Sequence, residues 1–107
     1  MTQREPDTHA ELRELVGDEA GVELRPMFGT LAALVDGHVF SVATADAVGV
    51  KLGPEALDDL GALPGSGMLM MGRRRMSAYR ALPPDLPAGE RRAWLRRARD
   101  HVSGLHH

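Results

Sequence analysis

Two apolar runs on either side of the dipeptide Asp36-Gly37 constrain the fold of this chain more than any other feature. The segment reads TLAALVDGHVFSVAT and covers residues 30–44. A two-residue type I′ turn requires positive φ at both central positions, and Asp-Gly is one of the pairs that adopts it most readily. The sequence therefore predicts a β-hairpin here.

Further strand-like segments extend this hairpin into a larger sheet. They cover residues 22–25, 47–52, 68–71 and 75–82. Pro26 has no N–H, so the strand before it must stop there or lie on a sheet edge. Because most connections between these segments are short, we expect the sheet to be antiparallel.

Three amphipathic segments predict helices over residues 7–19, 54–61 and 88–102. Pro54 suits a first helical position. The last segment has an apolar stripe of Trp94, Leu95, Ala98, Val102 and Leu105. Amphipathic helices need an apolar surface, which one face of a sheet supplies. We therefore expect an α+β fold. It would be a two-layer α/β sandwich with a mainly antiparallel five- to six-stranded sheet and helices at the N-terminus, middle and C-terminus.

Length and composition favour one small intracellular domain. A chain of 107 residues fits a single domain over residues 1–107, with a core at about 8–103. Cysteine is absent, which excludes disulfides and cysteine-based zinc sites and favours a reducing, cytoplasmic location. Residues 1–19 are polar and acidic, unlike a signal peptide, and no apolar run reaches the roughly 20 residues of a membrane helix. We expect no membrane association.

Charge is distributed unevenly along the chain. Residues 1–66 carry four cations and twelve acids, a net charge of −8, whereas residues 67–107 carry nine arginines and three acids, a net charge of +6. Such asymmetry can mark an anionic partner. It can also mark two halves that attract each other within one fold, and the shortness of the chain favours this second interpretation.

No group of residues predicts catalysis, a cofactor or a metal. The histidines show no metal-ligand spacing with a carboxylate, and no serine lies in a nucleophile-elbow motif. The sequence GSG at residues 65–67 lacks the surrounding pattern of a phosphate loop. We therefore expect a protein that is not an enzyme, with no catalytic, cofactor-binding or metal-binding residues.

An arginine-rich set forms a candidate contact for nucleic acid or another anion. Its members are Arg73, Arg74, Arg75, Arg80, Arg92, Arg96 and Arg99. Arginine can neutralise phosphate, but its stem also covers apolar surface while the head reaches water. Few aromatic residues interleave with these arginines, which weakens the nucleic-acid hypothesis.

A methionine set forms a second candidate surface. Its members are Met68, Met70, Met71 and Met76. Methionine fills irregular gaps in cores and also occurs on adaptable binding surfaces. In a chain with four aromatic residues, core filling is favoured. However, a strand that is apolar on both faces and is not covered twice would expose a patch, which predicts a protein partner or a homodimer.

The segment RPMFG, residues 25–29, is interpreted as a structural corner rather than a binding loop. Pro26 ends hydrogen bonding along the incoming strand, and Gly29 allows the backbone to turn into the hairpin. Met27 and Phe28 would anchor the corner, so Phe28→Ala should cost about 3–5 kcal/mol if Phe28 is fully buried.

Several of these motifs, taken in order, resemble the N-terminal domain of the TfoX/Sxy family. That family shows an Arg-x-Met-Phe-Gly corner, an apolar hairpin with a glycine turn, a Met-x-x-Tyr-x-x-x-Pro element and a Trp-x-x-x-Ala final helix. The matching positions are Arg25, Met27, Phe28, Gly29, Gly37, Phe40, Lys51, Leu52, Met76, Tyr79, Pro83, Trp94 and Ala98.

The resemblance implies a two-layer domain similar to secretion-chaperone-like folds, and it implies no catalytic residues. Known full-length members are regulators of natural competence and carry a C-terminal helical domain that is not part of this sequence. The leading hypothesis is therefore a non-enzymatic regulatory or protein-interaction module. Direct nucleic-acid binding through the arginines, or a small-molecule sensor domain, are the alternatives.

Overall fold

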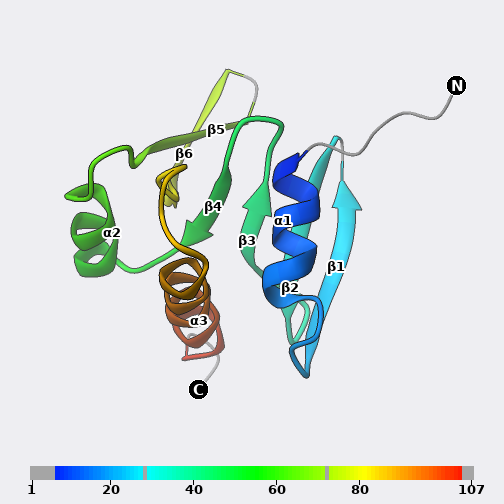
Figure 1. Ribbon diagram of the computed structural model, residues 1–107. Helices are drawn as coiled ribbons and strands as arrows, with labels where there is room; N and C mark the ends of the chain where they lie inside the picture. The colour runs from blue at the N-terminus through cyan, green and yellow to red at the C-terminus, as the bar shows by residue number, and fades with distance from the viewer. Residues whose placement is uncertain (1–6, 28, 72, 105–107) are drawn as a thin grey trace, which may run out of the picture.

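A computed structural model describes residues 7–27, 29–71 and 73–104 (Figure 1). Helices and strands follow the predicted order. They are α1 (Asp7–Val16), β1 (Val22–Met27), β2 (Thr30–Val35), β3 (His38–Ala43), β4 (Val48–Lys51), α2 (Pro54–Gly61), β5 (Gly67–Met71), β6 (Arg74–Ala81) and α3 (Ala88–Gly104).

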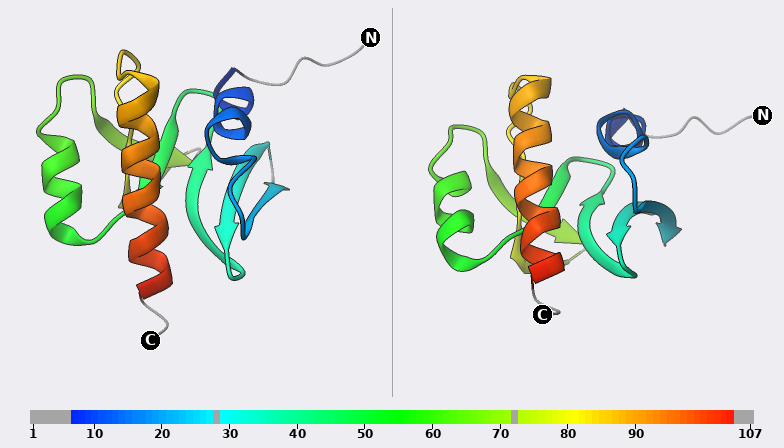
Figure 2. Two further views of the ribbon diagram at one scale, coloured as in Figure 1. Left: turned by 60° about the horizontal axis from the view of Figure 1, so that its bottom comes forward. Right: turned by 90° about the horizontal axis from the view of Figure 1, so that it is seen from below.

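The strands form one six-stranded antiparallel sheet in the order β1-β2-β3-β4-β6-β5. The predicted hairpin is confirmed: Asp36 and Gly37 have φ of 52° and 80°, and the turn joins β2 to β3. The three helices lie on one face of the sheet, as the two views of Figure 2 show. The expected α+β two-layer architecture is therefore confirmed.

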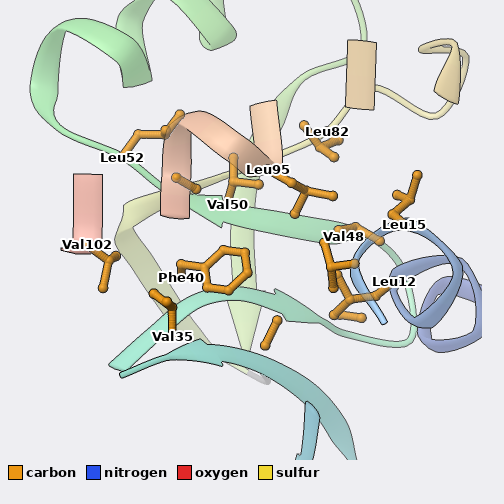
Figure 3. Close-up of a cluster of buried hydrophobic side chains, with 14 of the residues drawn as sticks. Leu12, Leu15, Val35, Phe40, Val48, Val50, Leu52, Leu82, Leu95 and Val102 are labelled. Carbon is orange, nitrogen blue, oxygen red and sulfur yellow. The ribbon is translucent and has the colours of Figure 1, made fainter. Parts of the chain in front are cut away.

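The main core lies between the helices and this face of the sheet. Phe40 of β3 is fully buried, together with Val50 of β4 and with Leu12 and Leu95 of the helices (Figure 3). Phe40 is the largest of the fully buried side chains, which explains how a chain poor in aromatic residues fills its centre.

A second, smaller apolar cluster lies on the opposite face of the sheet. Val42, Gly49, Ala81 and Gly67 are successive cross-strand partners from β3 to β5, so they share one face. The side chain of Leu69 is 2% exposed and packs in this cluster with Val42 and Ala81. The end of the sheet at β5 is thus apolar on both faces.

Element boundaries differ slightly from those expected. The first helix ends at Val16 rather than Glu19, because the chain turns after Gly17 and passes through Gly21 at φ 81° before β1. β4 is shorter than the expected strand over 47–52, and α3 continues two residues beyond 102.

Two residues named in the sequence predictions, Phe28 and Leu105, lie outside the described part of the chain. Within that part, none of the helices is long and apolar enough to cross a membrane.

Candidate protein-interaction surface

The most buried arginine, Arg91 of α3, is fully engaged in structural contacts. Its Nη2 donates to the main-chain oxygens of Pro83 and Pro84 over 2.8 and 2.7 Å, and its Nε donates to the oxygen of Leu86 over 2.7 Å. Its Nη1 lies 2.5 Å from the Glu11 carboxylate. Arg91 therefore ties α3 to α1 and to the loop before α3.

Two more arginines of α3 pair with acids from the first half of the chain. Arg99 donates to Glu19 over 2.8 Å, and Arg97 lies 3.6 Å from Asp59 while its guanidinium stacks 4.4 Å from the centre of the Trp94 ring. Together with Arg91–Glu11, these pairs join the basic half to the acidic half. These contacts agree with the interpretation that the two halves attract each other.

Arg80 is separated from its exposed neighbours by the fold. It is the cross-strand partner of Val50, so its side chain points towards the helix layer. It is half-buried, and its Nη1 lies 2.8 Å from the sulfur of Met68, next to Gly61 of α2. Arg80 therefore fills space between α2 and β5.

The remaining candidate arginines occupy two separate places. Arg73, Arg74 and Arg75 are exposed at the turn between β5 and β6, which projects at the top of Figure 1. Arg92 and Arg96 are exposed on α3, in the helix layer. The seven arginines of the predicted patch therefore do not form one surface. Arg99 forms an ion pair, Arg80 lies next to α2, and the other five are divided between α3 and the β5–β6 turn.

The methionines are also divided between two environments. Met76 is half-buried in the second cluster beside Leu69 and Tyr79. Burial raises the pKa of the Tyr79 phenol above its ordinary value, which agrees with a packed site. Met68 is half-buried against Arg80, whereas Met70 is 44% exposed. Met71 is placed by its backbone as the last residue of β5.

The two edges of the sheet differ in their protection. The edge strand β1 contains Pro26, and the charged side chains of Glu23 and Arg25 pair on it over 2.5 Å. Proline and charge are the usual means by which proteins block edge-to-edge pairing. The other edge strand, β5, reads GMLMM and contains neither. β5 therefore lacks the protection that β1 has.

The residues shared with the family motifs have structural roles. Gly29 has φ of 80°, and the Thr30 hydroxyl donates to the Met27 oxygen over 2.5 Å, which supports a turn at this point. The expectation that Pro26 ends the pairing of its strand is wrong, because β1 continues to Met27, the partner of Thr30; as an edge strand, β1 tolerates the missing N–H. Lys51 and Tyr79 are cross-strand partners. Trp94 is half-buried under the Arg97 guanidinium.

Hollows in the surface offer weaker sites. A cavity of about 280 Å³ between α1 and the start of β5 contains Glu11 and Arg91, but these two groups already bind each other. A groove of about 370 Å³ beside Trp94 is lined mainly by apolar side chains. In the described ranges, three or more His, Asp or Glu side chains do not come together in a possible metal site.

Two residues of structural importance were not singled out from the sequence. Leu69 lies in the middle of four apolar residues, and Arg91 lies in a run of arginines, so neither pattern distinguishes them from their neighbours. Residues 67–71 contain no proline and no charged residue, which can be read from the sequence. This absence indicates an unprotected edge only once the strand order shows that β5 lies at the edge of the sheet.

Comparison with known proteins gives one finding. The model of a family described as the TfoX N-terminal domain matches residues 14–102, most of the chain. No curated protein and no solved structure matches the chain.

Proposed function

Because the chain belongs to the TfoX N-terminal domain family, we propose that it is a cytoplasmic, non-enzymatic regulatory module that binds another protein chain through β5. One observation carries this proposal: β5 is an unprotected edge strand with an exposed methionine. Such an edge presents a row of unpaired main-chain N–H and C=O groups, which is a template for a further strand.

The contrast between the two edges supports the choice of β5. A sheet of this size has to prevent uncontrolled pairing at both ends, and here Pro26, Glu23 and Arg25 do so at β1. Leaving only β5 unprotected would be costly unless it had a partner, because exposed apolar edges promote aggregation. We therefore assign the interaction to β5.

The use of the arginines favours a protein partner over nucleic acid. Arg91, Arg97 and Arg99 are engaged with Glu11, Asp59 and Glu19, so much of the positive charge on α3 is neutralised within the fold. A nucleic-acid surface needs cations that remain available to phosphates. The arginines of the β5–β6 turn are available, but they occupy only a short segment.

The proposal can be tested by photo-crosslinking in living cells. Met70 is replaced by p-benzoyl-L-phenylalanine, and in a matched control Arg25, an exposed residue on the β1 edge, is replaced by the same residue. After irradiation we expect a discrete protein adduct from position 70 and none from position 25. Mass spectrometry of the adduct identifies the partner. Adducts that are absent at both positions, or equal at both, would remove the proposal.

A further inference from the structure

We propose, on the basis of the function above, that the partner of β5 is an extended segment with an acidic N-terminal end, which adds to the sheet as an antiparallel seventh strand. Backbone, apolar surface and charge each contribute to this inference.

The backbone of β5 determines the conformation of the partner. β5 is five residues long, it pairs with β6 on one side, and it ends the sheet on the other. Main-chain groups of an edge strand can be satisfied by another extended strand of about the same length. A helix could not pair with them, because its own N–H and C=O groups are already used.

The side chains of β5 determine the apolar part of the partner. Met70 is 44% exposed and has Arg75 of β6 as its cross-strand neighbour, whereas Leu69 on the other face is buried. A strand next to β5 would place one residue directly opposite Met70, within about 5 Å between Cβ atoms. An apolar residue there would cover the methionine side chain, and methionine adapts well to different partners.

The arginines at the end of β5 determine the charge of the partner. Arg73, Arg74 and Arg75 are exposed, and none of these three guanidinium groups takes part in an ion pair in the structure. They follow the C-terminal end of β5. In antiparallel pairing, the N-terminal end of the added strand lies beside them, so acidic residues at that end would be complementary.

A second copy of this chain fits the same edge less well. Symmetric antiparallel pairing of two β5 strands about Leu69 would set Met71 opposite Gly67. It would bring the arginines of one copy next to residues 63–65 of the other, which read Leu-Pro-Gly. No acid would then face the arginines, so charge complementarity favours a different, acidic segment.

The test uses fluorescence anisotropy with two labelled peptides of identical composition. The first has two glutamates followed by alternating valine and threonine over five residues. The second has the same five residues followed by the two glutamates. We expect the first peptide to bind about fivefold more tightly, since each exposed ion pair contributes a few tenths of a kcal/mol to about 1 kcal/mol. The first peptide should also slow amide exchange in residues 67–71.

Variants of the protein separate charge from strand pairing. Arg74→Ser/Arg75→Ser should weaken binding of the first peptide about fivefold, whereas Arg92→Ser/Arg96→Ser, which removes the same charge from exposed positions on α3, should not change it. Met70→Lys places a charge on the edge strand itself and should abolish binding. All these positions are exposed, so thermal melts should show that each variant is folded.

Other results would overturn the inference. Equal affinity for the two peptides, or equal loss with the two arginine pairs, would show that the acidic end is not read by the β5–β6 turn. A dimer in sedimentation experiments that Met70→Lys dissociates would assign β5 to a second copy. Binding of single-stranded DNA that Arg74→Ser/Arg75→Ser abolishes would assign these arginines to phosphates.

The two proposals fail in different ways. A crosslinked partner at position 70, combined with no binding of either peptide, would overturn the acidic segment and leave the interaction module intact. The absence of a crosslinked adduct at position 70 would overturn the proposed function itself.

Discussion

At the level of single residues, Gly49 determines how the far face of the sheet closes. A Cβ atom built on Gly49 would lie 2.4 Å from Cδ2, 2.8 Å from Cδ1 and 3.0 Å from Cγ of Leu69. Leu69 is buried against Val42 and Ala81, so it has little room to move away. Leu69 of β5 thus extends across β6 and fills the space on β4 that Gly49, which has no side chain, leaves open.

Gly49→Ala should therefore lower the free energy of unfolding. Insertion of a methyl group into a packed site typically costs about 1–3 kcal/mol. Urea denaturation followed by circular dichroism measures this cost. In the background of Leu69→Ala the added methyl group has room, so the same substitution should cost much less, and a double-mutant cycle would give a favourable coupling.

Gly67 provides a matched control for this prediction. It lies on β5 in the same cross-strand row, but a Cβ atom on Gly67 meets nothing within 4 Å. Gly67→Ala should change stability by less than about 0.5 kcal/mol. If the alanine at 49 is tolerated as well as the alanine at 67, Leu69 does not fill the space above Gly49.

At the level of elements, Arg91 ties the start of α3 to the loop before it and to α1. Arg91 satisfies three main-chain carbonyls in residues 83–86 and also the carboxylate of Glu11. The flat guanidinium group, with five N–H donors in a fixed arrangement, suits several acceptors at once. The Arg91 side chain of α3 therefore holds the loop that leads from β6 into this helix.

Arg91→Met should destabilise the fold by about 3 kcal/mol, because buried carbonyls lose their donors and Glu11 loses its partner. The side chain of Glu11 is 33% exposed, so water screens part of its lost ion pair. Chemical denaturation measures the loss. Arg91→Lys should restore little of it, since an ammonium group cannot reproduce the set of donors.

The neighbouring arginine is the control for this substitution. Arg92 lies on the same helix turn but is exposed, so Arg92→Met should change stability by less than about 0.5 kcal/mol. Similar losses for the two variants would mean that positive charge on α3, rather than the contacts of Arg91, maintains the loop.

Local signals made most elements predictable from the sequence. Asp36-Gly37 specifies its own turn, and Pro26 limits its strand to an edge, because both effects depend only on the backbone of the residues concerned. Long-range placement was not predictable in the same way. Arg80 belongs to a run of basic residues in the sequence, but the pairing of β4 with β6 puts it opposite Val50 and directs it under α2.

The candidate surface shows the same limit. The sequence identified the methionines and arginines around residues 68–76 as a possible site, but it could not separate the buried ones from the exposed ones. A register shift between Met68 and Leu69 decides which side chains enter the second cluster. Such a shift depends on how β5 pairs with β6. It cannot be predicted from the sequence of β5, because every residue of this strand is apolar.

At the level of the whole molecule, part of the uneven charge of the chain is used inside the fold. The acidic half supplies α1 and α2, the basic half supplies α3, and the ion pairs described above connect them. The β5–β6 turn is the part of the basic half that projects away from this helix layer (Figure 1). The arginines that form ion pairs in the helix layer and those that we propose to contact a partner are therefore different residues.

A charge exchange between Glu19 and Arg99 tests this division at a pair whose members lie 80 residues apart in the sequence. The two side chains are 25% and 33% exposed and lie 2.8 Å apart. Arg99→Glu should lower the free energy of unfolding by about 1 kcal/mol, because two carboxylates would then face each other between α3 and the connection from α1 to β1. Glu19→Arg should cost a similar amount by setting two guanidinium groups together.

The double variant Glu19→Arg/Arg99→Glu re-forms the pair with its direction reversed, so it should be more stable than either single variant, as measured by urea denaturation at low salt. Raising the salt concentration should narrow the difference, since the pair is only partly shielded from ions. Binding through β5 should be unaffected, because the β5–β6 turn keeps all its arginines. Additive losses in the double variant would show that attraction between the acidic and basic halves does not stabilise the fold.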